Sequence, residues 1–256
     1  MKLATWNVNS IRQREKHVCR WLENAEPDFL LLQETKCEAT HFPCGTFNNL
    51  GYQTEAVGQK AYNGVAVLSR RPYTVRHCAL PGLADDDAQA RYIEIEAGGA
   101  TIMNVYVPNG NSGGDPGFAY KLAWLDRLAG RAECLLDEDT PLIVAGDFNI
   151  CPGDDDLAPG TLPPTDALVR TESRARFRRL LWAGMTDAIR AIHPAGPIYT
   201  FWDYQAGAWR RNAGLRIDHV LLSPTFSERL ISAEPYRQER GEPQPSDHVP
   251  VMVELQ

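Results

Sequence analysis

Side chains that can bind a metal ion or move a proton stand next to short apolar runs at many places along the sequence. They are Asn7, Glu34, Tyr106, Asn109, Asp147, Asn149, Asp218, Asp247 and His248. The first six follow apolar runs, whereas the last three precede them. Carboxylate and amide oxygens bind hard divalent cations, and a carboxylate or an imidazole can also transfer a proton. The set therefore predicts a metal-assisted hydrolytic site.

These side chains can meet at one edge of a folded sheet. Acids at the carboxyl ends of early strands and at the amino ends of late strands share a rim if the two groups of strands run antiparallel. Such a rim would crowd several carboxylates together, and their repulsion is unfavourable unless a cation neutralises it. We expect this cation to be Mg²⁺, with Mn²⁺ as the alternative, and to be held by one or two of the carboxylates.

Each short motif also has an ordinary structural interpretation. Glu34 suits the first turn of a helix or a solvated loop. Asp147 and Asn149 suit an Asx-turn. Asp247 suits a structural cap beside a surface histidine, His248. Taken one at a time, the motifs therefore leave both the structural and the functional interpretation open.

The apolar pattern predicts the elements that would position these residues. Expected strands are residues 3–8, 28–33, 65–69, 92–97, 101–107, 142–145, 198–202, 217–222 and 249–255. Expected helices are residues 12–23, 118–136 and 172–182. Gly98-Gly99 predicts a two-residue hairpin turn, and residues 152–164 predict a long surface loop. This many strands with three long helices favours two packed sheets flanked by helices over a plain βαβ alternation.

The bulk composition is that of a folded protein, and we expect one domain spanning residues 1–256. Hydrophobic residues make up 43% of the chain and charged residues 23%. The sequence contains no apolar run of roughly eighteen residues that could form a transmembrane helix, and its start lacks the apolar stretch of a signal peptide. The six cysteines are scattered without a C-x-x-C pair, which indicates reduced thiols. We therefore expect a cytoplasmic, monomeric protein that does not bind membranes.

The net charge of −7 argues against a nucleic-acid partner, but it hides an asymmetry. Residues 161–220 contain nine arginines and five acids, a local charge of +4, whereas acids cluster at residues 85–87 and 154–156. A basic face on an acidic body is compatible with binding DNA, although charge alone does not establish it.

Seven motifs, in order along the chain, resemble the exonuclease III branch of the endonuclease/exonuclease/phosphatase superfamily. They are Trp6-Asn7-Val8-Asn9, Leu32-Gln33-Glu34-Thr35-Lys36, Tyr62-Asn63-Gly64-Val65-Ala66, Asn104-Val105-Tyr106-Val107-Pro108-Asn109-Gly110, Gly146-Asp147-Phe148-Asn149-Ile150, Gly214-Leu215-Arg216-Ile217-Asp218 and Ser246-Asp247-His248. They cover nearly the whole chain. The resemblance implies a four-layered α/β sandwich, in which two mixed sheets pack together between helices, and a single active site at the sheet edges.

The resemblance also implies how the ion would be held. Glu34 would bind Mg²⁺, Asp247 would assist directly or through water, and Asn7 would orient the ligands. The expected surroundings of the ion are Asn7, Glu34, Asp147, Asn149, Asp247 and His248.

Catalytic roles follow from the same resemblance. Asp147 would position and deprotonate the attacking water, and Asn149 would hold that water and a phosphate oxygen. His248, oriented by Asp218, would contact the phosphate, and Tyr106 would stabilise the transition state or the leaving group. The acid that protonates the leaving oxygen stays open; we favour a water on the metal.

Substrate-binding residues are expected on both sides of the scissile phosphate. Asn109 would contact a phosphate, and an apolar pocket for a base-less sugar would use Phe201, Trp202, Leu215 and Ile217. The alternative is that these apolar residues belong to the core. Candidate contacts to DNA phosphates are Arg174, Arg178, Arg210, Arg211 and Arg216, with Arg12 and Lys36 beside the site. The alternative for the arginines is a solvated surface.

The implied activity is cleavage of duplex DNA on the 5′ side of abasic sites, together with removal of 3′-phosphates, other 3′ blocks and 3′-terminal nucleotides. Residues 111–117 and 154–165 match no family pattern, so the balance between AP endonuclease and 3′-end activities stays open. Two rival hypotheses are a phosphoesterase with a non-DNA substrate and an inactive DNA-binding scaffold. The arginine-rich segment speaks against the first, and the complete set of acids with His248 speaks against the second.

Overall fold

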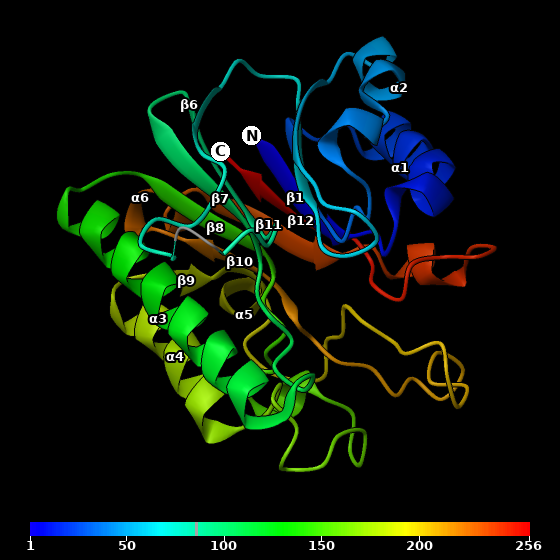
Figure 1. Cartoon of the computed structure of the whole chain (residues 1–256), viewed down its shortest axis with the longest axis vertical. Helices are drawn as coiled ribbons and strands as arrows, with labels where there is room; N and C mark the ends of the chain where they lie inside the picture. Colours follow the sequence, from blue (N-terminus) through cyan, green and yellow to red (C-terminus); the bar gives the residue numbers. More distant parts are fainter. Residues whose placement is uncertain (85–86) are drawn as a thin grey trace.

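Two six-stranded mixed sheets form the centre of the protein in a computed structural model that describes residues 1–84 and 87–256 (Figure 1). The first sheet has the order β11 (Leu230–Pro235), β12 (Val251–Leu255), β1 (Lys2–Asn7), β2 (Phe29–Gln33), β4 (Val65–Ser69) and β3 (Gln53–Val57). The second has the order β5 (Thr74–His77), β6 (Tyr92–Ala97), β7 (Ala100–Tyr106), β8 (Leu142–Asp147), β10 (Asp218–Leu222) and β9 (Thr186–Asp187). The predicted α/β sandwich is confirmed.

The outer faces of the two sheets are covered by α1 (Ile11–Ala25) and α2 (Cys44–Asn49) on the first sheet and by α3 (Gly114–Asp137) and α4 (Thr171–Trp182) on the second. The short helices α5 (Ala188–Ile192) and α6 (Pro224–Ser227) pack against the core between the sheets. The 3-10 turns are η1 (Ala39–His41), η2 (Asp154–Asp156) and η3 (Arg237–Gly241). Figure 1 shows α3 and α4 side by side on the second sheet and α1 with α2 against the first. The three predicted helices are thus confirmed as α1, α3 and α4, with ends shifted by a few residues.

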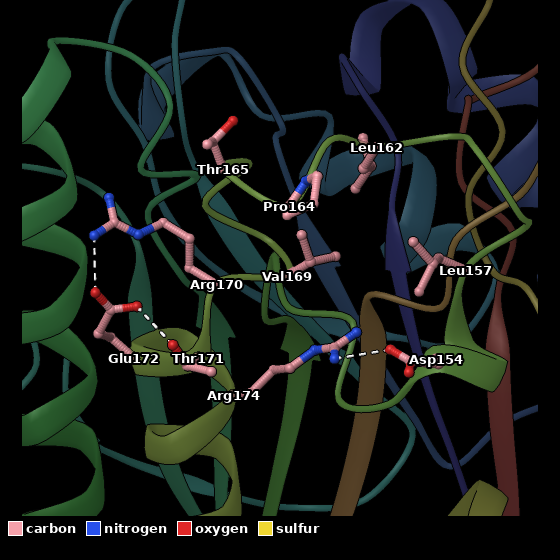
Figure 2. Close-up of a pocket in the computed structure, with 10 residues that line it drawn as sticks. All are labelled: Asp154, Leu157, Leu162, Pro164, Thr165, Val169, Arg170, Thr171, Glu172 and Arg174. Carbon is pink, nitrogen blue, oxygen red and sulfur yellow. Dashed lines mark hydrogen bonds and ion pairs between the residues drawn. The ribbon is translucent and has the colours of Figure 1, made fainter.

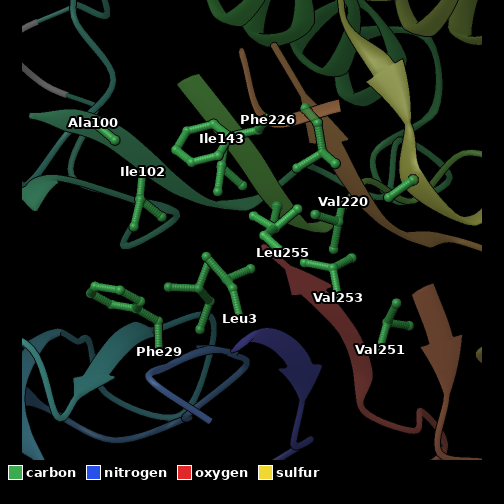
Figure 3. Packing of buried hydrophobic residues seen from close by; sticks show 14 of the residues in the cluster. Leu3, Phe29, Ala100, Ile102, Ile143, Val220, Phe226, Val251, Val253 and Leu255 are labelled. Carbon is green, nitrogen blue, oxygen red and sulfur yellow. The ribbon is translucent and has the colours of Figure 1, made fainter. Parts of the chain in front are cut away.

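The central strands are apolar on both faces because each face packs against another layer of the protein, and successive side chains point to opposite faces. Phe29 and Leu31 of β2 point between the sheets, whereas Leu30 and Leu32 pack beneath α1. The same alternation sends Ile143 of β8 into the layer between the sheets (Figure 3). Burial of both faces removes apolar area from water on each side of the strand, which stabilises the sandwich by about 25 cal/mol for each Å².

Several sequence expectations are corrected or confirmed by the described residues. Residues 198–202 do not form a strand; Phe201 makes only isolated bridges, to Leu215 and to His248. Gly98 and Gly99 form the predicted turn, with φ of 59° and 79° between the paired Ala97 and Ala100. Apart from the short turn η2, residues 152–164 are a loop.

Further expectations concern the cysteines, the acidic clusters and the membrane. All six cysteines are free thiols. Two acids of the cluster at residues 85–87, Asp85 and Asp86, lie outside the described residues. Within residues 1–84 and 87–256, no helix is long and apolar enough to span a membrane.

Strand direction brings the polar strand ends to one rim. β1 runs parallel to β2, and β7 runs parallel to β8, so that Tyr106 is opposite Asp147. The late strands β12 and β10 run antiparallel to β1 and β8, which places Asp218 opposite Asp147. Carboxyl ends of early strands and amino ends of late strands therefore meet, as the sequence predicted.

Candidate active site

Three side chains from distant parts of the chain converge at this rim. One ligand atom each from Glu34, Asp147 and His248 lies within 4.8 Å of the others. The amide nitrogen of Asn7 lies between the two carboxylates and donates to Glu34 Oε1 at 2.8 Å and to Asp147 Oδ2 at 2.9 Å. Asn7 therefore keeps the carboxylates of Glu34 and Asp147 close together. Two neighbouring negative charges repel each other, and a bound cation would stabilise them.

The backbone around the site adopts conformations that expose these groups. Glu34 and Asn149 have left-handed φ angles of 51° and 50°, which are uncommon for residues other than glycine. Gly146 has a φ of 153°, and a Cβ there would lie 1.9 Å from the carbonyl oxygen of Val105. Gly146 thus lets β8 pass close to β7 immediately before Asp147, and such strained positions cluster at functional sites.

A buried dyad joins His248 to Asp218. Nδ1 of His248 lies 2.8 Å from Asp218 Oδ2, and the Thr200 hydroxyl donates to the same carboxylate at 2.6 Å. The ring of Phe201 packs against the imidazole at a centroid distance of 4.9 Å. Burial by itself lowers the pKa of His248, but the charge of Asp218 and its hydrogen bond outweigh burial and raise this pKa. His248 is therefore held as an imidazolium in a single orientation.

Asp147 lies on the other side of the imidazole with looser contacts. Nε2 of His248 is 3.9 Å from Asp147 Oδ2, and the backbone N–H of Asn149 donates to Asp147 Oδ1 at 2.9 Å. Burial raises the pKa of Asp147, the nearby charge of Asp218 adds to the rise, and His248 opposes it. A carboxylate with a raised pKa is a stronger proton acceptor, so this residue suits the role of a base.

Glu34 is the more acidic carboxylate of the cluster. Burial raises its pKa, but Lys36, whose Nζ lies 2.8 Å from Glu34 Oε2, and Asn7 together outweigh burial and lower it. Nδ1 of His248 is engaged by Asp218, and the oxygen atoms of Glu34 and Asp147 are the ligands in this cluster that a hard cation prefers. Such a donor set fits Mg²⁺.

Asp247 lies beside this cluster, outside the group of three. Its Oδ1 accepts from Asn9 Nδ2 at 3.0 Å, and Asn9 also contacts Lys36 and, weakly, Tyr204. Asp247 is thus linked to Glu34 through Asn9 and Lys36. Its predicted role in binding the metal stays a prediction.

Tyr106 and a pair of amides line the other side of the site. Burial raises the pKa of Tyr106, and so do the charges of Glu34 and Asp147, so that its hydroxyl stays a donor. Asn109 donates to Asn149 Oδ1 at 2.9 Å. These side chains face the carboxylates from the second sheet.

The predicted DNA-binding residues separate into interior and surface groups. Arg216 is only 1% exposed, and its guanidinium forms buried ion pairs with Asp156 at 2.7 Å and with Asp187 at 2.8 Å. It therefore cannot reach a DNA phosphate, and its predicted contact to a phosphate is wrong. Arg210 and Arg211 are exposed, and Arg178 is half-buried. Arg12 and Lys36 line one surface pocket of about 460 Å³.

Arg174 is partly engaged within the protein. It donates to the carbonyl of Cys151 at 2.9 Å and pairs with Asp154 at 2.9 Å (Figure 2). Figure 2 shows Arg174 and Asp154 at one side of a cavity of about 660 Å³, which Val169 and Leu162 also line. Its contact to DNA stays a prediction.

Some of the predicted pocket residues line a cavity that adjoins Phe201, the ring packed on His248. Phe201 and Leu215 line this cavity of about 320 Å³ together with Leu162. Ile217 packs behind Leu215 in the same apolar cluster. Trp202 is 1% exposed and packs in a separate cluster, so for this residue the core alternative holds.

Three residues around the site were missed by sequence reasoning. Asn9 holds Asp247, Thr200 holds Asp218, and Lys121 of α3 donates to the carbonyl oxygen of Asn149. A lysine within the apolar stripe of a helix was the one signal available for Lys121. The contacts of Asn9 and Thr200 depend on tertiary structure and gave no local signal.

Comparison with known proteins agrees with this geometry. A profile of the endonuclease/exonuclease/phosphatase family matches residues 4–248. Exodeoxyribonuclease III of Haemophilus influenzae is 33% identical over 267 residues, which cover 100% of both chains. A 3′ phosphatase from Neisseria, solved with a product DNA hairpin, is 37% identical with a TM-score of 0.95, covering 100% of this chain and 99% of that one. An AP endonuclease from Archaeoglobus fulgidus is 34% identical with a TM-score of 0.93 and the same coverage. The chain therefore belongs to the exonuclease III/AP endonuclease branch of this family and is a DNA repair phosphodiesterase of that type.

Proposed function

We propose that the protein hydrolyses the P–O3′ bond in duplex DNA, both on the 5′ side of abasic sites and at blocked 3′ ends. Incision at an abasic site, removal of a 3′-phosphate and release of a 3′-terminal nucleotide all break this bond and leave a 3′-hydroxyl. One arrangement of a base, hydrogen-bond donors to the phosphate and a bound cation therefore serves all three reactions. The observation that carries the proposal is the convergence of Glu34, Asp147 and the His248–Asp218 dyad on one rim.

Asp147 is the proposed base. Its carboxylate has a raised pKa. Oδ1 accepts from the backbone N–H of Asn149, and Oδ2 accepts from the side-chain amides of Asn7 at 2.9 Å and, more weakly, Asn149 at 3.4 Å. A carboxylate has roughly four lone-pair sites, so a water in front of it can still transfer a proton to it. The side-chain amide of Asn149 would hold the water and a phosphate oxygen, and Asn109 would bind another phosphate oxygen.

His248 and Tyr106 are the proposed donors to the phosphate. Nδ1 of His248 is engaged by Asp218, so Nε2–H is left to donate to a non-bridging oxygen, where negative charge develops. The hydroxyl of Tyr106, kept protonated by its surroundings, would donate on the opposite side. Neither donor has to reorient during the reaction, which is why fixed donors are effective.

Glu34 and Asp147 would hold Mg²⁺ through oxygen atoms, with Asn7 orienting them and Asp247 acting through Asn9 or water. When bound, the ion supplies positive charge for the phosphate and leaving oxygens. Glu34→Gln keeps the size of the side chain and removes its charge. It should weaken Mg²⁺ binding, measured by calorimetry, and lower kcat at limiting Mg²⁺, whereas unchanged binding would remove Glu34 from the ion site.

Duplex DNA as the substrate is supported by the Neisseria relative that was solved with a DNA hairpin. Arg210 and Arg211 are exposed, and Arg211 lines the cavity beside Phe201. Arginines at the rim of a cavity can neutralise phosphates that flank the scissile bond. A base-less sugar would enter the space beside Phe201 and Leu215.

The test uses three end-labelled duplexes, each with Mg²⁺ and with a chelator: one with an internal abasic analogue, one with a 3′-phosphate and one with an unmodified recessed 3′ end. We expect Mg²⁺-dependent cleavage of all three and none with the chelator. A soluble phosphate ester in a fourth arm separates a DNA enzyme from a general phosphoesterase. Turnover of the ester without cleavage of any duplex would contradict the proposal.

A second candidate is an enzyme restricted to 3′ ends, with little AP endonuclease activity. It is favoured by Leu162, which lines the cavity beside Phe201 where an extrahelical sugar would have to fit. The two candidates differ in one ratio, kcat/KM for the abasic duplex divided by kcat/KM for the 3′-phosphate. A ratio far below one favours the second candidate.

A further inference from the structure

A buried lysine behind the active site connects three loops. Lys121 of α3 is fully buried, and its ammonium donates to the carbonyl oxygens of Asn109 at 3.0 Å, Asn149 at 2.6 Å and Ala167 at 3.3 Å. The first acceptor follows β7, the second follows β8 and the third precedes α4. An ammonium has three N–H donors, so each proton has one acceptor.

The buried charge of Lys121 destabilises the folded protein, so packing alone does not explain why a lysine occupies this position. Burial of an ammonium is unfavourable and lowers the pKa of Lys121, although the charge of Asp147 opposes this shift. The three carbonyl oxygens around Nζ favour the charged form. A methionine would fill similar space without that cost. The loop is also built around the lysine, because a Cβ on Gly110, whose φ is 87°, would lie 2.6 Å from Lys121 Cδ.

The three carbonyls belong to the segments that carry the site. Asn109 and Asn149 are joined by a side-chain hydrogen bond of 2.9 Å, and the N–H of Asn149 holds Asp147 Oδ1 at 2.9 Å. The ammonium therefore fixes the backbone from which both amides and the Asp147 contact extend. Ala167 is held in addition by Ser173, whose hydroxyl donates to the same carbonyl at 2.6 Å.

We propose that Lys121 is a positioning residue for phosphodiester hydrolysis, which fixes the Asn109 and Asn149 backbones and thereby sets the amide pair against the phosphate and Asp147. This inference rests on the proposed function, because Asn149 is its link to the reaction. Loss of the ammonium would let the two loops move independently. Small displacements of groups that touch the reacting atoms are enough to slow a reaction greatly.

Lys121→Met tests the proposal, with Trp124→Phe as the matched control. Trp124 lies on the same helix and packs in the core between α3 and the sheet, so its truncation loosens the helix without touching the three carbonyls. Measured well below both melting temperatures, Lys121→Met should lower kcat by ~10–100-fold. KM should change little, since most of the affinity comes from other phosphate contacts. A merely structural lysine would give the same small kcat loss as Trp124→Phe, and that result would overturn the proposal.

A double-mutant cycle identifies the link to Asn149. If Lys121 acts through Asn149, then Lys121→Met should cost far less kcat when Asn149→Ala is already present than in the wild type. An equal loss in both backgrounds would overturn this route.

Hydrogen exchange separates failure of this inference from failure of the proposed function. In Lys121→Met, amides of residues 107–111 and 148–151 should exchange faster than in Trp124→Phe, whether or not a DNA substrate is cleaved. Unchanged protection there would overturn the positioning role. An inactive wild type with the expected exchange pattern would instead count against the proposed function alone.

Discussion

Asp147 and Asp218 stand opposite each other in the antiparallel ladder of β8 and β10, and the imidazole of His248 lies between their carboxylates. The two contacts are unequal: 2.8 Å to Asp218 Oδ2 and 3.9 Å to Asp147 Oδ2. The tight contact charges and orients the imidazole, while the loose one leaves Asp147 able to accept a proton. One strand pair thus gives two identical side chains different roles.

Asp218→Asn removes the negative charge next to His248 while it keeps the size of the side chain, so it tests whether that charge controls the protonation of His248. In the wild type the pKa of His248 is raised to about 10, so His248 stays protonated as pH rises through neutrality. Without the Asp218 charge, burial dominates and the pKa falls, so the variant should lose its proton, and its residual activity, as pH rises. We expect kcat at neutral pH to fall by at least ~10²-fold. The exposed acid Asp137, changed to Asn, is the control.

The measurement for that prediction is kcat for 3′-phosphate removal across pH 5–9. A variant whose profile keeps the wild-type shape would show that Asp218 does not control the protonation of His248.

The sequence predicted the centre of both sheets but missed their edges. The four strands that the apolar pattern did not predict, β3, β5, β9 and β11, are the outermost strands of the two sheets. Central strands are buried on both faces, so their runs are continuously apolar and easy to detect. Edge strands are partly exposed to solvent, so polar and apolar residues alternate less regularly along them; β5, for example, is mostly exposed.

Within the site, residue types at strand ends were predictable, but their partners were not. The rim requires only that β1, β2, β7 and β8 end where β10 and β12 begin, and this follows from strand direction. The burial of Arg216 was missed because its partners, Asp156 and Asp187, lie in unrelated segments. An arginine in the sequence looks the same whether its guanidinium faces phosphate or carboxylate.

Asp147→Asn should make the protein less active and more stable. Removal of the base should lower kcat by at least ~10²-fold, while DNA affinity changes much less. Burial raises the pKa of Asp147 to about 7 from an ordinary value of 3.8, so between these pH values the folded protein holds a proton that the unfolded chain has lost. The stability of the wild type therefore falls as pH rises across this window.

The predicted gain in stability is checked by thermal melting of the wild type and of Asp147→Asn from pH 4 to 8, without Mg²⁺. The variant lacks the buried charge, so the difference between its melting temperature and that of the wild type should grow up to about neutral pH and then level off. Each kcal/mol of destabilisation that the variant relieves should raise its melting temperature by about 2–4 °C. Mg²⁺ should then stabilise the wild type more than the variant. A variant that cleaves DNA at the wild-type rate would show that Asp147 is not the base.

Arg216 and Arg211 should respond to substitution in opposite ways. Arg216→Met leaves Asp156 and Asp187 buried without that partner, which should reduce the free energy of unfolding by roughly 3–5 kcal/mol. Arg211→Ala should leave stability nearly unchanged but weaken DNA binding, and the slope of log affinity against log salt should fall by about 0.9 for one lost phosphate contact. Denaturant unfolding and salt-dependent binding of a short duplex are the two measurements. An unchanged salt slope would place Arg211 outside the DNA interface.

Phe201→Ala should discriminate between abasic incision and 3′-phosphate removal. In incision, a sugar without a base lies on the 3′ side of the scissile phosphate, and the cavity beside Phe201 can receive it; in removal of a 3′-phosphate, no sugar lies on that side. Enlarging the cavity should therefore lower kcat/KM for incision by roughly ten-fold or more, with a smaller effect on the phosphatase reaction. Phe201 also packs on His248, so Leu215→Ala, which enlarges the same cavity without that contact, is the matched variant. If Phe201→Ala slows both reactions equally while Leu215→Ala slows neither, Phe201 serves to hold the imidazole, and the cavity does not select the substrate.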